Sequence, residues 1–422
     1  MMRFHENVKA FEFANHIVIG NLTTGYVIGL NEKGVSICMK LFHSDCRPEE
    51  IQEVDPELFK HLELGSFFKH EPQGESLKGA YLHVTQRCNL DCVGCYSFDE
   101  KRNKYQDPNL SKMISALDFL GDMNIQSLII SGGEPFLRND LPEIIDYAYT
   151  RLRIPQISII TNGTYADDDV LTSLKGKVIQ IGVSIDGYSS DCIPHIRRVQ
   201  RFDTLTKTIQ KIKTHDINVH IIPTIHRRNY QDIQKYIALS KTLGTTMNFS
   251  LLSAPTDNIE AQELLPNESD LRQLGMTCLS SLKDKNIAFL DTPLGLSLCA
   301  RKSCGLSKSI ISIDSDGEIY PCHMLHTKEF SMGNVYQDNP DNILASEIRK
   351  ALLSSHVDEY SECCDCSIKY LCGGGCRARA YFASGSLLGK DSYCEMIKTF
   401  YKGYEESIMD AKTRKRETPK TL

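Results

Sequence analysis

Short runs of β-branched and other apolar residues alternate with amphipathic stretches between residue 80 and about residue 285. The runs predict six strands: "AYLHVTQ", "SLIIS", "QISIIT", "VIQIGVSI", "NVHIIPT" and "TTMNFSLL". The stretches between them, such as "DLPEIIDYAYTRL" and "FDTLTKTIQKIK", place apolar residues at helical spacing. Strands that alternate with helices form parallel sheets with crossover helices. Six units are too few for a full eight-fold barrel, so the pattern predicts an α/β fold with a partial (β/α)6 TIM-like barrel.

The pattern differs on both sides of this barrel segment. Residues 1–75 contain two apolar runs around a turn at residues 23–25, then three short helical stretches, and predict a small separate domain ending in a polar linker. We assign residues 76–285 to the barrel, residues 286–400 to a cysteine-rich domain and residues 401–422 to a basic C-terminal tail. The last part of the tail, "AKTRKRETPKTL", is poor in apolar residues, and we expect a solvated, frayed end there.

Composition limits the classes of molecule that this chain is expected to bind. The chain has 422 residues and a formal net charge of −6, which does not indicate a nucleic-acid partner. The N-terminal "MMRFHENVKAFEF" has no apolar signal region, and no apolar run is long enough to span a bilayer. We therefore expect a cytoplasmic protein with no membrane partner, in a compartment where thiols stay reduced. The sixteen cysteines then indicate metal binding rather than disulfides.

Three cysteines follow the first predicted strand in "TQRCNLDCVGCYS": Cys88, Cys92 and Cys95. A structural zinc site uses four ligands and usually two pairs, whereas this loop offers three. Each iron of a [4Fe–4S] cluster normally takes one thiolate, so three thiolates leave one iron open to a substrate. Barrel enzymes place their active sites at the carboxyl ends of strands, where this loop lies. A zinc loop or three unrelated thiols are the alternatives.

The loop resembles the cluster loop of the radical S-adenosylmethionine (SAM) enzymes. In that family the open iron is chelated by the amino and carboxylate groups of SAM. One electron from the cluster cleaves SAM and yields a 5′-deoxyadenosyl radical, which abstracts hydrogen. The residue before the third cysteine is usually aromatic in the family but is Gly94 here, so only a backbone contact with adenine is expected.

Further segments resemble the family in order along the predicted strand ends. They are "SGGEP" after the second strand, "TNG" after the third, "VSIDG" after the fourth and then "HIRRVQRFD". The two glycines of "SGGEP" let the backbone approach a ligand, and its glutamate is implied to hold the amino group of SAM. The resemblance implies five SAM-binding residues: Gly132, Gly133, Glu134, Ser184 and Arg197. Arg197 is expected near the SAM carboxylate, with Arg198 as the alternative because two usual glycines are replaced in this segment.

A second group of cysteines lies in the C-terminal part, where "ECCDCSIKYLCGGGC" holds five of them. With the hairpin-like "DSDGEIYPC" and the turn "MGNV", their spacing matches the SPASM domain, a C-terminal extension of some radical SAM enzymes. The resemblance implies two auxiliary [4Fe–4S] clusters with interleaved ligands. The first takes Cys299, Cys304, Cys322 and Cys376, and the second takes Cys363, Cys366, Cys372 and Cys394. Two zinc sites are the alternative, and the other cysteines of the C-terminal part and of the rest of the chain have no expected ligand role.

These resemblances imply an enzyme with three [4Fe–4S] clusters, SAM and an external low-potential electron donor. SPASM enzymes mostly act on peptides or proteins. We expect an oxidoreductase or peptide-modifying maturase that forms a thioether, C–C or C–O crosslink, or an epimer, in a ribosomally made precursor peptide. One alternative is an anaerobic sulfatase maturase, which makes formylglycine, but that group carries an aspartate where this chain has His323. The other is an electron-transfer or scaffold protein, which would need no SAM motif.

Residues 1–75 resemble the peptide-recognition element of peptide maturases, a small winged-helix fold related to the pyrroloquinoline quinone peptide chaperone. The resemblance implies that this domain binds the leader segment of the precursor peptide. Pairing of an extended leader with a strand edge is the physical route that we expect. A structural cap on the barrel is the alternative.

Overall fold

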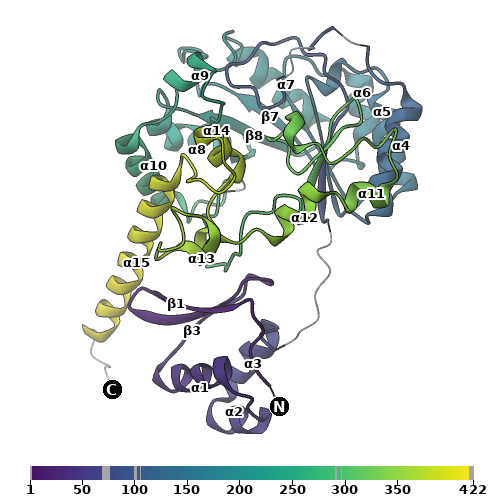
Figure 1. Cartoon of the computed structure of the whole chain (residues 1–422). Helices are drawn as coiled ribbons and strands as arrows, with labels where there is room; N and C mark the ends of the chain where they lie inside the picture. The colour runs from purple at the N-terminus through teal and green to yellow at the C-terminus, as the bar shows by residue number, and fades with distance from the viewer. Residues whose placement is uncertain are drawn as a thin grey trace.

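The computed structural model describes residues 2–68, 77–98, 102–104, 106–289, 292–295 and 297–417, with side chains to residue 410. An N-terminal domain lies below a larger α/β body in Figure 1, and the C-terminal helix runs beside both. Most of the predicted linker after the N-terminal domain falls outside the described residues.

The predicted parallel strands form the central sheet (Figure 1). Its strands are β4 (Gly79–His83), β5 (Ser127–Ser131), β6 (Gln156–Thr161), β7 (Gln180–Ile185), β8 (Val219–Ile225), β9 (Thr246–Asn248) and β11 (Ile287–Ala288), in that spatial order, with β10 (Ser250–Leu251) beside β8. The helices of this region are α4 (Leu110–Asp122), α5 (Leu141–Asp146), the π-helical turn η2 (Tyr147–Arg151), α6 (Asp168–Leu174), α7 (Phe202–Thr214), α8 (Ile233–Leu243), α9 (Ile259–Glu263) and α10 (Glu268–Ser281). The α/β partial-barrel prediction is therefore confirmed.

Side chains on β4 alternate between the two faces of the sheet, as the strand period requires. Ala80 and Leu82 are fully buried in the same apolar core as Leu117 of α4. Tyr81 and His83 lie on the opposite face, where they contact rings of the C-terminal domain. One face of the first barrel strand thus packs on helices, and the other faces the site described below.

The C-terminal domain joins the barrel sheet, which the sequence did not predict. The expected hairpin at "DSDGEIYPC" consists of β12 (Ile310–Ile313) and β13 (Ile319–Tyr320). Strand β12 also pairs in parallel with β4. The remaining helices are α11 (Pro340–Leu344), α12 (Glu347–Ser354), α13 (Lys369–Cys372), α14 (Arg377–Ser384) and α15 (Cys394–Glu417). Short 3₁₀ turns lie at Pro135–Leu137, Tyr230–Asp232, Lys328–Phe330 and Val357–Glu359.

The N-terminal domain has an antiparallel sheet followed by three helices. Its strands are β1 (Val8–Phe13), β2 (His16–Asn21) and β3 (Val27–Gly29), and its helices are α1 (Glu32–His43), α2 (Pro48–Val54) and α3 (Pro56–Leu64). The predicted turn and helices are present, and the side chain of Asn31 caps α1 by accepting the amide of Gly34 at 2.8 Å. A separate apolar core, which includes Ile19, Leu41 and Leu62, holds this domain together.

The predicted boundary between the cysteine-rich domain and a C-terminal tail at residue 401 is wrong, because α15 continues through it to residue 417. Tyr401 is only 2% exposed, and its ring meets Phe13 edge-on. The amide of Ala14 donates to Glu405 at 3.2 Å, so the N-terminal domain packs on this helix. Basic residues obscured this apolar face in the sequence. None of the helices in the described ranges is long and apolar enough to cross a membrane.

Candidate functional site

The loop after β4 brings the thiols of Cys88, Cys92 and Cys95 within electrostatic reach of one another. Burial is the main cause that raises the pKa of Cys92 to about 12. The charges of Cys95 and Cys88 also raise this pKa, and the charge of Arg197 lowers it. A thiol with so high a pKa stays protonated near neutral pH until a metal ion displaces the proton. The Cys92 thiol is therefore not a free thiolate nucleophile near neutral pH.

Arg102 belongs to this site and was missed in the sequence. Its guanidinium donates to the Ser97 carbonyl at 2.6 Å and lies 3.5 Å from the Cys95 sulfur. Burial lowers the pKa of Arg102, but the charges of Cys95, Cys88 and Cys92 outweigh it and raise the pKa. A cation here would offset the negative charge of thiolate ligands. The only sequence signal was a basic residue close behind the three cysteines.

The glycines of the SGGEP turn allow close packing against the cysteine loop. Gly132 has a φ of +125°, and a Cβ there would lie 2.4 Å from the carbonyl oxygen of Thr85. A Cβ on Gly133 would lie 2.1 Å from the carbonyl oxygen of Arg87. The amides of Gly133 and Glu134 donate to these same carbonyls, each at 2.7 Å. The glycines thus allow the SGGEP backbone to pack closely on the backbone of the cysteine loop. Their contact with a ligand stays a prediction.

The carboxylate of Glu134 is fully buried and faces the end of β6. It accepts hydrogen bonds from the Thr161 hydroxyl and the Asn162 amide, both at 2.7 Å, and from the Phe136 amide at 3.1 Å. Burial raises the pKa of Glu134 to about 7, against these donors, which lower it. The side chain therefore joins the SGGEP turn to the TNG turn. Its contact with the amino group of SAM stays a prediction.

Glu134→Gln is expected to lower the free energy of unfolding by about 1–3 kcal/mol. The amide has one acceptor oxygen, so it cannot serve the Asn162 and Phe136 amides together. Thermal unfolding of the cluster-free protein measures the loss. Thr161→Ser keeps the hydroxyl donor and serves as the control. Equal unfolding midpoints for Glu134→Gln and the parent would show that the carboxylate does not join the turns.

Arg197, rather than the alternative Arg198, lies beside the thiols. Its side chain is buried and paired with the carboxylate of Asp186, which also accepts the Arg197 amide at 2.6 Å. The Nε of Arg197 has no hydrogen-bond partner within the described part of the chain. Arg198 has a φ of +60° and pairs at the surface with Glu260. An unsatisfied buried donor indicates an acceptor that binds there, such as a carboxylate.

A cavity beside Arg197 is lined by residues of several motif segments. Its lining includes Leu90 of the cysteine loop, Asn162 of the TNG turn, and Asp186 and Gly187 after β7. Ser184 lies half-buried near the carboxyl end of β7. The motifs that the sequence singled out thus meet at the carboxyl ends of neighbouring strands, where barrel enzymes bind their ligands.

A zinc site and a [4Fe–4S] cluster differ in how far apart they hold their thiolate ligands. Throughout the described ranges, no three cysteines place their sulfur atoms within 4.8 Å of one another. A tetrahedral zinc ion with Zn–S bonds of ~2.3 Å holds its sulfurs about 3.8 Å apart. In a [4Fe–4S] cluster each thiolate binds its own iron, so the sulfurs stand farther apart.

Four cysteines gather around α13 and the start of α15. Burial raises the pKa of Cys372, and the charges of Asp391, Cys394, Cys363 and Cys366 raise it further. All four thiols are therefore within electrostatic reach. They are the set that the resemblance implies for the second auxiliary cluster.

Cys304, Cys322 and Cys376 pack against one apolar cluster that includes Leu306, Leu325 and Phe330. The charge of Cys304 adds to the burial that raises the pKa of Cys376. The predicted fourth ligand, Cys299, lies against the N-terminal domain. A Cβ on Gly25 of the N-terminal domain would lie 2.6 Å from its sulfur. Ligation by Cys299 stays a prediction.

Family models match both cysteine-bearing regions. The model of the radical SAM superfamily matches residues 82–239, and the SPASM model, an iron–sulfur cluster-binding domain, matches residues 304–367. The chain carries a radical SAM domain and a SPASM domain. The radical SAM domain binds a [4Fe–4S] cluster and SAM, and the SPASM domain binds auxiliary iron–sulfur clusters. The chain is accordingly an enzyme.

Relatives of this radical SAM/SPASM enzyme include biosynthetic proteins. It is 27% identical over 327 residues to the mycofactocin maturase MftC of Mycobacterium tuberculosis, covering 74% of this chain and 81% of the relative. It is 25% identical over 307 residues to the antilisterial bacteriocin subtilosin biosynthesis protein AlbA of Bacillus subtilis, covering 70% of this chain and 66% of AlbA. It is 26% identical over 337 residues to the AdoMet-dependent heme synthase of Methanosarcina barkeri, covering 74% of this chain and 94% of that protein.

Solved structures share the fold. SuiB of Streptococcus suis, bound to its precursor peptide SuiA, matches with a TM-score of 0.59 at 18% identity, covering 93% of this chain and 100% of that one. The structure of anSMEcpe with bound AdoMet matches with a TM-score of 0.63 at 18% identity, covering 79% of this chain and 99% of that one. At this coverage the SuiB likeness extends into the N-terminal domain.

A buried ion pair fixes the end of the SPASM domain. Three successive glycines, residues 373–375, have φ values of +64°, +81° and +72°, and they turn the chain sharply before Cys376. Asp391 accepts the amide of Cys376 at 2.7 Å and that of Tyr393 at 2.9 Å. Its two oxygens also accept two hydrogen bonds from Arg379, each at 2.8 Å. Asp391 thus positions the backbone at Cys376 and just before Cys394.

Five cysteines have no expected ligand role, and one of them, Cys192, lines the cavity beside Arg197. Cys364 lies 3.4 Å from the Ser361 carbonyl, and Cys192 lies 3.5 Å from the Ser189 hydroxyl. Cys38 and Cys278 are buried, and Cys46 is half-buried.

Proposed function

We propose that this enzyme matures a ribosomally made precursor peptide by abstracting hydrogen and forming a crosslink or an epimer. MftC is named a maturase, AlbA takes part in bacteriocin biosynthesis, and SuiB binds a precursor peptide. The observation that carries the proposal is the N-terminal domain, whose sheet leaves β3 as an edge strand. The alternative of formylglycine formation lacks its aspartate base, because His323 follows Cys322 and stacks on Tyr81 at 4.1 Å.

The radical SAM site would work as follows. Cys88, Cys92 and Cys95 would hold a [4Fe–4S] cluster, which would supply the electron for cleavage of SAM and so the radical for hydrogen abstraction. Arg197 offers its free Nε to a carboxylate of the bound ligand. Gly132, Gly133, Glu134 and Ser184 are the proposed further contacts to SAM. Of these groups, Gly132 and Glu134 are buried, and Gly133, Ser184 and Arg197 are half-buried.

The SPASM thiols are proposed to hold two auxiliary [4Fe–4S] clusters. The first cluster is held by Cys304, Cys322 and Cys376, and also by Cys299 if its side chain turns toward them. Cys363, Cys366, Cys372 and Cys394 take the second. Full ligation favours a role in accepting the electron that remains after bond formation. If Cys299 does not ligate, the first cluster keeps an iron open to a substrate thiolate. An external low-potential donor is the proposed electron source for SAM cleavage.

The outer edge of β3 is suited to an extended peptide. In the β2–β3 pair the Asn21 amide donates to Tyr26, and the Leu30 amide donates to Ile17. Because hydrogen-bonding directions alternate along a strand, the amides and carbonyls of Val27 and Gly29 point away from β2. Unpaired groups on an edge strand accept another strand. The leader of the precursor is the proposed occupant.

Gly29→Pro is expected to weaken leader binding at least about tenfold, a loss of ~1.4 kcal/mol, while SAM cleavage stays unchanged. Proline removes the outward amide and blocks pairing. Gly29→Ala is the matched control, since a Cβ at this position meets no atom within 4 Å. Fluorescence anisotropy with a labelled leader measures the affinity. Equal affinity of the two variants would exclude β3 as the binding edge.

Truncation is a less specific test of the same idea. The N-terminal domain packs on α15, and its Gly25 carbonyl accepts the amide of Ala300 at 2.9 Å. A chain that starts near Gly79 would lose these contacts as well as the β3 edge. Point substitution separates recognition from the role of a structural cap.

A further inference from the structure

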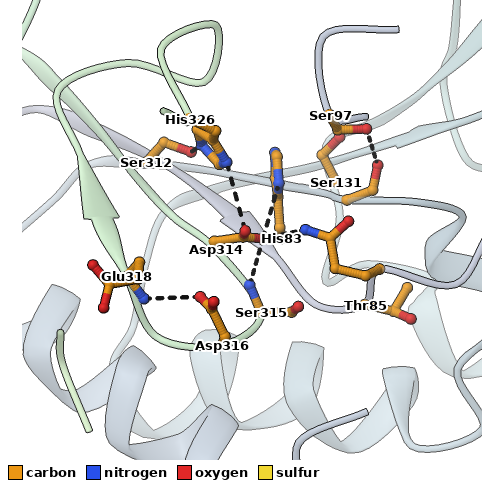
Figure 2. Close-up of polar contacts among 12 residues, drawn as sticks. His83, Thr85, Ser97, Ser131, Ser312, Asp314, Ser315, Asp316, Glu318 and His326 are labelled. Carbon is orange, nitrogen blue, oxygen red and sulfur yellow. Dashed lines mark hydrogen bonds and ion pairs between the residues drawn. The ribbon is translucent and has the colours of Figure 1, made fainter. Parts of the chain in front are cut away.

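Three buried side chains from distant parts of the chain meet on the inner face of β4 (Figure 2). They are His83, Asp314 and His326, and one donor atom from each lies within 4.8 Å of the others. The register explains the first two, because Leu82 pairs with Ile313, so the next residue along each strand falls on the same face. His83 Nδ1 lies 3.5 Å from Asp314 Oδ1, and His326 Nδ1 lies 3.9 Å from Asp314 Oδ2.

His83 is unsatisfied in this position. Its side chain is 0% exposed, and within the described ranges neither ring nitrogen has a hydrogen-bond partner. A buried polar group without a partner carries a desolvation cost, and such groups are uncommon in folded proteins. A ring nitrogen without a hydrogen bond, 3.5 Å from a carboxylate oxygen, points to a ligand held between them.

The other two side chains are held by neighbours that leave one donor atom free. His326 Nε2 lies 2.7 Å from the hydroxyl of Ser312, so Nδ1 is directed at Asp314. Asp314 Oδ1 accepts from Gln86 Nε2 at 2.6 Å and from the Ser315 amide at 2.7 Å. Asp314 Oδ2 remains for the shared site. Metal-binding histidines and carboxylates are typically oriented by such outer hydrogen bonds.

We propose that His83, Asp314 and His326 bind a divalent transition-metal ion of the Zn²⁺ or Fe²⁺ type. Two imidazoles and one carboxylate are a common donor set for these ions and leave a coordination position for water or substrate. Metal–ligand bonds of ~2.0–2.2 Å bring the donor atoms to about 3 Å of one another. Small side-chain shifts from the present separations suffice.

This ion would be distinct from the iron–sulfur clusters and would lie between two of them. The ring of Tyr96, which follows Cys95, lies 6.2 Å from that of His83. His326 belongs to the segment that follows Cys322. The site therefore adjoins both the radical SAM loop and the first SPASM set. It does not depend on which substrate the enzyme modifies.

Zinc loading of the reconstituted holoenzyme tests the proposal. Zn²⁺ is the probe because it binds nitrogen and oxygen sites more tightly than Fe²⁺. After excess zinc is added and removed by gel filtration, elemental analysis gives zinc and iron per chain. X-ray absorption at the zinc edge gives the ligand type. We expect about one zinc per chain with nitrogen and oxygen ligands at ~2.0–2.1 Å, whereas zinc on cysteines shows sulfur at ~2.3 Å.

His83→Gln and His326→Gln are each expected to lose this zinc while keeping the iron content of the parent. His220→Gln is the matched control, since this buried histidine has partners on both nitrogens, Thr246 at 2.7 Å and Asn248 at 2.5 Å. It should keep the zinc. Asp314→Asn, which preserves shape, replaces either variant if that variant loses its iron. Absence of zinc from the parent, a sulfur-only shell, or full zinc retention by the variants would overturn the proposal.

Discussion

Replacing Cys88, Cys92 and Cys95 together with alanine is expected to abolish the conversion of SAM into 5′-deoxyadenosine. SAM cleavage needs an electron from a cluster with an open iron, and this loop supplies the three thiolates of that cluster. The SPASM thiols come from other elements and do not depend on the loop. Iron should therefore fall from about twelve to about eight per chain, the loss of one four-iron cluster.

Chromatographic assay of 5′-deoxyadenosine and elemental iron analysis make the two measurements. Cys364→Ala is the matched control, because this thiol has no expected ligand role and lies 3.4 Å from the Ser361 carbonyl. It should keep both iron and activity. SAM cleavage at the parental rate in the triple variant would refute the assignment of the loop. Loss of all iron would show that the clusters do not form independently.

Asp391→Ala is expected to destabilise the SPASM domain by about 3–5 kcal/mol. The substitution leaves the fully buried guanidinium of Arg379 without its carboxylate. It also leaves the amides of Cys376 and Tyr393 without their acceptor. A loss of this size lowers the unfolding midpoint by roughly 10 °C in a domain of this size. The backbone beside Cys394 also loses its anchor, so iron retention should fall.

An exposed ion pair provides the control for the Asp391→Ala variant. Glu347 pairs with Lys350 at 2.7 Å, and their side chains are 89% and 58% exposed. Exposed ion pairs stabilise proteins by only about 0–1 kcal/mol, so Glu347→Ala should unfold near the parental midpoint. Differential scanning fluorimetry follows both variants. An unfolding midpoint for Asp391→Ala equal to that of Glu347→Ala would mean that the buried pair does not hold the domain.

The barrel could be predicted from the sequence because its strands and helices repeat with clear periods. The three thiols after β4 lie within reach of one another, as their spacing in one loop predicted. The grouping of the SPASM cysteines came from the family resemblance. The pairing of β12 with β4 could not be predicted. Alternation identifies a strand but not its partner, and residues 79–82 and 310–313 are far apart in the sequence. The tail after residue 400 was misjudged because its charge concealed a buried face that includes Tyr401.

Site residues that act through tertiary contacts left little trace in the sequence. Arg102 is one basic residue in a loop and belongs to no pattern. His83 and His326 come together only because β12 joins the barrel sheet and brings its hairpin over β4. Glu134 was recognised in its motif, but its hydrogen bonds to the next turn required the fold. Local spacing therefore identifies candidate ligands, while the residues that position them require the structure.

Peptide maturation is tested most directly by the mass of a peptide. The protein is co-expressed anaerobically with each short peptide that a search of the reading frames beside its gene yields, in ordinary and in deuterated water, and the intact mass of the peptide is measured. The account predicts the loss of two hydrogen atoms for a crosslink, or uptake of deuterium for an epimer, and no change with the Cys88, Cys92 and Cys95 triple variant. An unmodified peptide, together with conversion of a sulfatase-type cysteine peptide to formylglycine, would contradict it.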